Sequence, residues 1–174
     1  MNFDFIPYFK TLSEQHKLIR HSETDKRFYI ISGVNQLEEL LSNPKTRYPV
    51  VLVNDDDSGR LMDNQGDSVW DKRPYSFYVF DNFKNIMDIK ERNQKKSICR
   101  SIGFDMISKM MLDKKNEMKG LVKGTGLRNL DISSITYFMV GPLLDNLIGM
   151  EFFFAIDEKP NLKFNPEQWL LTQI

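Results

Sequence analysis

YSFYVFDNF, residues 75 to 83, is the most informative segment for the fold, because large side chains occur at both odd-numbered and even-numbered positions. Successive side chains of a β-strand point to opposite faces, so this segment would present apolar groups on both faces. Such a strand has to be covered on both sides or lie against a partner. The segment is therefore predicted to be the central strand of a sheet.

Apolar segments on either side of it predict further strands. FYIIS at 28–32 and PVVLVN at 49–54 have the aromatic and β-branched composition of short buried strands. DISSITYFMV at 131–140 and LIGMEFFFAID at 147–157 have the same character, and GPLLDN between them supplies turn residues. The last two segments are expected to form an antiparallel pair.

Two helices are predicted in the N-terminal half. Apolar side chains recur at helical spacing in residues 4–20, which favours an amphipathic helix. A shorter helix, QLEELL, is expected to follow Asn35 as its N-terminal cap. It should stop at Asn43, because the residue before a proline disfavours helical geometry.

The longest helix is predicted between Ile86 and Met118, where helix-forming residues dominate. Its core face is predicted from apolar residues at steps of four: Ile98, Ile102, Met106 and Met110. An adjoining strip is expected to join the core: Phe104, Ile107 and Met111. Together these elements predict an α+β fold, with a mainly antiparallel sheet packed against helices and a C-terminal β-hairpin. A single domain is expected over residues 1–174, with 158–174 as an extended C-terminal segment.

Composition excludes several classes of protein. Lys+Arg and Asp+Glu are both 24, so the chain has no overall charge that would attract nucleic acid or anionic lipid. Cys99 is the single cysteine, which rules out an internal disulfide and a CxxC metal motif. No run of about 18 apolar residues predicts a membrane span, and the start MNFDFIPYFK does not resemble an export signal. A cytoplasmic protein is expected.

The acidic stretch from Asn54 to Arg73 is predicted to be a long solvated loop. Such a length is unusual for a connection within a domain and is typical of functional loops. A calcium loop with Gly59 at its sixth position would need a glutamate where Gln65 stands, so no metal site is predicted. KGLVKGTGLRN at 119–129 resembles a phosphate loop only in composition, since a helix precedes it, and is interpreted as a helix exit.

No catalytic group and no cofactor is predicted. His16 and His21 are expected to be exposed helix residues on different faces, without a serine or cysteine elbow beside them. Large apolar side chains outside the regular elements instead predict anchors on a neighbouring protein. The residues of this predicted interface are Trp70, Phe164, Trp169, Leu170 and Leu171.

The order of elements over roughly residues 4 to 157 resembles that of the tail-terminator and tail-completion proteins of long-tailed bacteriophages. The matching pieces are YPVVLVN, YSFYVFDNF, the helix around ICRSIGFDMISKM, and NLIGMEFFFAID. The segment FYIISGVNQLEELL and the C-terminal extension are additions to that order. The resemblance implies a non-enzymatic subunit of a homo-oligomeric ring, often hexameric, that joins the tail tube to the head connector.

The same resemblance places the long acidic loop toward the lumen through which DNA passes. Like charge would repel the phosphate backbone there, so no specific nucleic-acid binding is expected. The loop residues concerned are Asp55, Asp56, Asp57, Asp63 and Asp67. The implied locations are the cytoplasm during assembly and then the virion, with another tail or connector protein as partner and no membrane.

Two alternatives stay open at this point. The first is a metal-dependent hydrolase or nuclease that uses Asp55, Asp57 and Asp81, the last of these on the predicted central strand. The second is an adaptor domain that binds another protein through its C-terminal segment.

Overall fold

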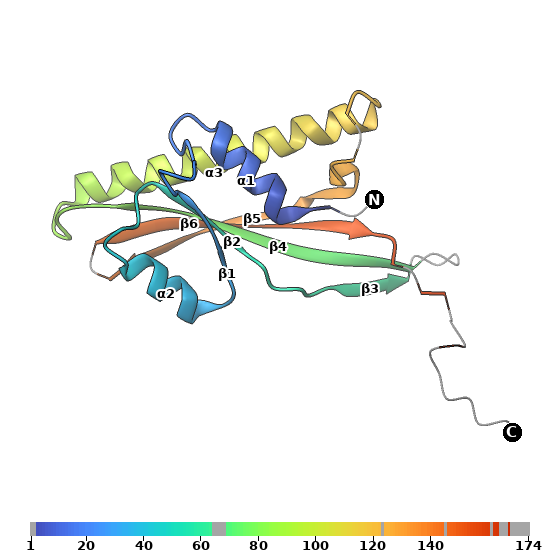
Figure 1. Cartoon of the computed structure of the whole chain (residues 1–174), viewed down its shortest axis with the longest axis horizontal. Helices are drawn as coiled ribbons and strands as arrows, with labels where there is room; N and C mark the ends of the chain where they lie inside the picture. The colour runs from blue at the N-terminus through green and yellow to red at the C-terminus, as the bar shows by residue number, and fades with distance from the viewer. Residues whose placement is uncertain are drawn as a thin grey trace, which may run out of the picture.

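The computed structural model describes residues 3–63, 69–122, 124–144, 146–160, 162–163 and 167, and its centre is a mainly antiparallel sheet (Figure 1). Six strands form this sheet within the described residues. They are β1 (Phe28–Ile31), β2 (Val50–Asn54), β3 (Arg60–Asp63), β4 (Val69–Asn82), β5 (Leu130–Leu143) and β6 (Leu147–Glu158). The α+β fold class predicted from the sequence is confirmed.

The strand order is β1-β2-β4-β6-β5, with β3 paired to the first part of β4. The YSFYVFDNF segment lies in β4 between β2 and β6, so its prediction as the central strand is confirmed. β5 and β6 form the expected antiparallel pair. One pair, β1 with β2, is parallel.

The helices lie on both sides of the sheet (Figure 1). α1 (Phe5–Gln15) and α3 (Ile89–Met118) cover one face, whereas α2 (Val34–Ser42) lies on the other face toward its β1–β2 end and packs in one cluster with Phe80 of β4. The predicted cap of α2 is wrong: the helix already begins at Val34, and Asn35 lies inside its first turn. Gly33 precedes the helix with a φ of 83°, a conformation that side-chain-bearing residues avoid.

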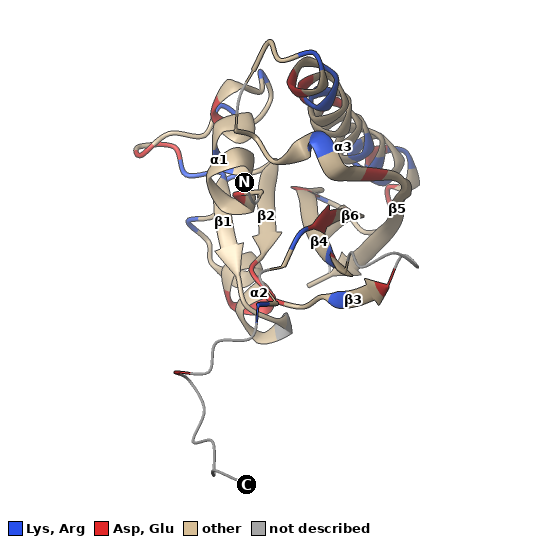
Figure 2. Cartoon of the chain, turned by 90° about the vertical axis from the view of Figure 1, so that its right-hand side faces the viewer, with Lys and Arg blue, Asp and Glu red and all other residues tan. Residues whose placement is uncertain are grey.

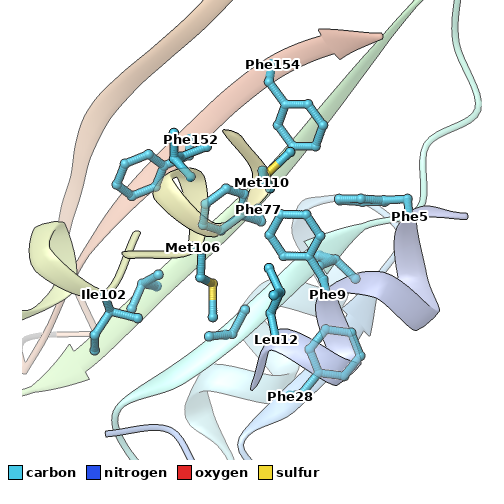
Figure 3. Packing of buried hydrophobic residues seen from close by; sticks show 14 of the residues in the cluster. Phe5, Phe9, Leu12, Phe28, Phe77, Ile102, Met106, Met110, Phe152 and Phe154 are labelled. Carbon is cyan, nitrogen blue, oxygen red and sulfur yellow. The ribbon is translucent and has the colours of Figure 1, made fainter. Parts of the chain in front are cut away.

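The main core lies between the sheet and the α1–α3 layer (Figure 3). Phe77 and Phe152 stack there with ring centroids 4.9 Å apart, and Phe9 of α1 packs against Phe77. Gly103 lets α3 approach the sheet, because a Cβ at this position would lie 2.1 Å from the Phe152 ring. Cys99 is buried in the same layer, as its apolar neighbours predict.

A smaller core forms under α2 on the opposite face. Phe80 of β4 is buried there with Leu52 of β2 and Leu37 of α2, so β4 is covered on both faces as predicted. The core face of α3 is also largely confirmed, with Ile102, Met106 and Met110 all buried. Of the adjoining strip, Ile107 is buried in the main core as predicted, whereas Phe104 and Met111 are exposed.

Replacing Ile102 by Asp is expected to unfold the protein. Its side chain is completely buried in the main core, and an unpaired carboxylate there costs on the order of 3 kcal/mol or more. Leu112→Asp is the matched control, because Leu112 lies on the same helix and is 51% exposed. In urea unfolding, the control variant should lose less than about 1 kcal/mol of unfolding free energy. Equal midpoints for both variants would reject the core assignment.

Candidate interaction surface

The structure divides the stretch predicted as one long acidic loop. β3 occupies residues 60–63 and pairs with β4, which begins at Val69, so a hairpin replaces the continuous loop from Asn54 to Arg73. The four-residue strand is short and lies among turn-forming residues, which conceals its pattern in the sequence. Asp63 belongs to β3, opposite Val69, and Asp67 lies outside the described residues.

The three consecutive aspartates are exposed in the connection between β2 and β3. They do not converge on one point, because each carboxylate accepts a hydrogen bond from a different side chain. Asp55 accepts from Ser32, Asp56 from Asn54 and Asp57 from Arg73.

Asp81 lies far from these aspartates along the sheet. Val50 is paired with Phe80 in the antiparallel β2–β4 ladder, which puts Asp81 near the start of β2 and Asp55 just past its end. At about 3.3 Å per residue the separation is roughly 20 Å, so the structure does not bring these carboxylates together. Asp81 is buried and accepts a hydrogen bond from Lys95 of α3 at 3.1 Å. Within the described ranges no cluster of His, Cys, Asp or Glu has the arrangement of a metal site.

The glycine-rich stretch after α3 is a helix exit held by a carboxylate from that helix. Glu117 accepts hydrogen bonds from the Thr125 hydroxyl and from the backbone N–H groups of Gly126 and Arg128. These are donors of the kind a phosphate loop would offer to its ligand. The protein's own side chain already occupies them.

The histidines differ from their predicted setting. His16 follows the last turn of α1 and lies 3.3 Å from Asp105 of α3. His21 lies outside the helix and is buried, with Nδ1 accepting a hydrogen bond from the Arg27 N–H. Burial lowers the pKa of His21 below its usual value. Both side chains have structural partners.

Only Trp70 among the predicted interface residues lies within the described part of the chain. It stands in β4, half-buried, with the Lys159 ammonium 5.2 Å from the centre of its ring. The Trp70 side chain is therefore partly covered by its own chain and is less accessible to another protein than the sequence predicts. The other four predicted interface residues lie outside the described residues: Phe164, Trp169, Leu170 and Leu171.

An exposed apolar surface that the sequence did not predict lies at the β5 end of the sheet. β5 is an edge strand, paired only with β6 in the described structure. It exposes apolar side chains on both of its faces, since Tyr137 pairs with Phe152 toward the main core and Phe138 pairs with Glu151 on the opposite face. Phe138 and Met139 are 58% and 53% exposed.

α3 extends this surface on one side of β5. Phe104 is 41% exposed and makes an edge contact with the Tyr137 ring at 5.1 Å, while Arg100 lies 5.9 Å from the same ring. Met111, two turns after Phe104 on the same helical face, is also exposed. Their predicted place in the core is wrong, because the sheet ends at β5 and nothing in the described chain covers its outer side. We call the following residues the β5 surface: Phe104, Met111, Ile132, Tyr137, Phe138 and Met139.

A bulge near the start of β5 shapes this surface. The register with β6 shifts between Asp131 and Thr136, and the Ser134 hydroxyl accepts the Ala155 N–H at 2.7 Å in place of a backbone carbonyl. The Lys72 ammonium of β4 donates a hydrogen bond of 2.5 Å to the Asp131 carboxylate. This pairing lowers the pKa of the Asp131 carboxyl to about 2. Beyond the bulge, Thr136 to Val140 pair regularly with β6.

No family model matches the sequence, and no curated protein matches it. Among the described residues, no helix is both long enough and apolar enough to cross a membrane.

Replacing Lys72 by Met is expected to raise the pKa of Asp131 from about 2 toward its ordinary value of 3.8. A carboxyl group whose pKa is lower in the folded than in the unfolded protein stabilises the fold at pH values above its unfolded-state pKa. This stabilisation is lost as the pH falls toward about 2. The variant should therefore show a weaker dependence of stability on pH between these two values. Carboxyl NMR titration measures the shift, with exposed Lys45→Met as control. An unchanged Asp131 titration would contradict the pairing.

Proposed function

We propose that this protein is a non-enzymatic assembly subunit that forms a ring, of the kind represented by the tail terminators of long-tailed bacteriophages. The observation that carries the proposal is the β5 surface, an exposed strand edge with apolar side chains on both faces. Its partners would be other copies of the chain and a tail or connector protein. It would act in the cytoplasm during assembly and remain in the virion.

The β5 surface has the properties of an unfilled subunit contact. Natural edge strands are usually protected by charged residues, proline or strong twisting, because their free N–H and C=O groups pair readily with other strands. From Thr136 to Val140 the strand contains no charged residue and no proline. Exposed apolar side chains gathered along a strand edge typically mark a protein contact.

The acidic connection between β2 and β3 fits the same proposal. Asp55, Asp56 and Asp57 are exposed and lie apart from β5, at the other side of the β4–β6 pair. If this connection faces the lumen of a ring, its charge keeps passing DNA from adhering to the wall. Together with Asp63 and Asp67, it would have a passive electrostatic role.

Wild-type protein is expected to assemble in a concentration-dependent manner, and Phe138→Lys should abolish this assembly. A lysine at the centre of the β5 surface puts a charge into a contact that must lose water. Leu18→Lys is the matched control, since Leu18 is 54% exposed and lies in the connection between α1 and β1. Sedimentation velocity over a broad concentration series measures the size of each variant, and thermal melting verifies that both are folded.

The strongest contrary result would be catalytic activity without assembly. Three results together would reject the proposal: the wild type stays monomeric, it does not bind the protein encoded by the adjacent gene, and it hydrolyses nucleic acid in a manner that Asp57→Asn abolishes. The protein would then be assigned as an enzyme.

A further inference from the structure

We propose that the β5 edge of one copy pairs in antiparallel fashion with the β1 edge of the next copy, in a head-to-tail contact. The inference rests on the proposed function, and it names the partner of the β5 surface and the orientation of the contact. β5 and β1 are the two edge strands at opposite ends of the main strand order. Joining them continues the sheet from subunit to subunit.

Strand directions favour this contact. β1 runs parallel to β2, and each of the pairs β2–β4, β4–β6 and β6–β5 is antiparallel. β5 therefore runs opposite to β1. A second copy placed in the same orientation at the end of the sheet would present its β1 to β5 as an antiparallel partner, the more stable of the two pairings.

The side chains on the α2 face of the two edges are complementary in shape. Phe138 projects on this face, as its contact with Phe153 shows, and it is 58% exposed. On the same face of β1, a groove of about 260 Å³ opens between the strand and α2. The groove is lined by Tyr29, Ile31, Gln36, Glu39, Leu40 and Lys45, among others. An aromatic ring fits a groove with this mixed apolar and polar lining.

The opposite face offers a second apolar match. Phe28 and Ile30 of β1 point toward the α1–α3 side, since Tyr29 and Ile31 pack under α2. Ile30 is 45% exposed, and Tyr137 and Met139 of β5 project on the same side. In a continued sheet these side chains would meet across the new strand pair.

The lengths of the two edges also agree. β1 has four residues, Phe28–Ile31, and the regular part of β5 beyond its bulge runs from Thr136 to Val140. The bulge at one end and Pro142 at the other limit pairing to this part of β5. A short ladder with side-chain contacts on both faces is the expected result.

A symmetric contact between two β5 strands is disfavoured by charge. Two antiparallel strands related by a two-fold axis keep the same sheet faces together, which would bring the two α3 helices onto one face of the joined sheet. α3 carries eight Lys or Arg residues and four Asp or Glu residues, and the basic positions are coloured blue on its ribbon in Figure 2. Repulsion between two such helices opposes this arrangement.

Head-to-tail contacts have a further consequence for assembly. Every open assembly of such subunits keeps one free β5 edge and one free β1 edge at its two ends, so subunits add until the assembly closes into a ring, or it grows as a filament. The contact proposed here is therefore of the type that a ring subunit needs.

The test uses two variants that each block one edge. Phe138→Lys with Met139→Lys blocks β5, and Ile30→Lys blocks β1; all three side chains are exposed, and melting verifies that the variants fold. Each variant alone should be monomeric. Mixed in equal amounts they should give a 1:1 dimer and nothing larger, because one intact pair of edges remains. Leu18→Lys should assemble as the wild type does.

The outcomes separate the inference from the proposed function. If Ile30→Lys assembles alone like the wild type while the β5 variant stays monomeric, β5 has another partner, and the head-to-tail inference is overturned while the assembly function stands. A mixture that stays monomeric overturns the inference as well. A wild type that remains monomeric at every concentration overturns both proposals.

Discussion

The structure depends on the requirement that β4 be covered on both faces. Phe77 and Val79 point to the α1–α3 layer, whereas Phe80 points to α2, so a single helical layer would leave large aromatic groups in water. The segment that carries β1 and α2 supplies the second cover. It also creates a parallel strand pair at one end of an otherwise antiparallel sheet.

The cover is incomplete at the other end, and this explains the β5 surface. α3 packs over β4 and β6, with Gly103 against Phe152. Phe104 remains exposed beside Tyr137 of β5, and Met111 is exposed two turns further along the helix. The free energy gained by covering such groups is the driving force that we assign to assembly.

Charged groups in the described chain are largely used to hold elements together. Lys95 ties α3 to Asp81 of β4, Lys72 ties β4 to the β5 bulge, and Glu117 fixes the exit from α3. Carboxylates that look like ligands or catalytic acids in the sequence thus have internal partners. Their distribution along separate strands and connections follows from the register of the sheet.

Periodicity and turn chemistry are local properties, so the helices, the central strand and the C-terminal hairpin could be predicted from the residues alone. The buried face of α3 could be predicted for the same reason. Three features depend on contacts between distant residues and became visible only in the folded chain: β3 splits the acidic loop, Asp81 lies far from Asp55, and Phe104 is exposed. ITYFMV carries large side chains on both faces just as β4 does, yet one strand is buried and the other lies at an edge. Strand order and register are set by contacts between distant residues, and so the place of a segment in the sheet decides whether its apolar side chains form a core or a surface.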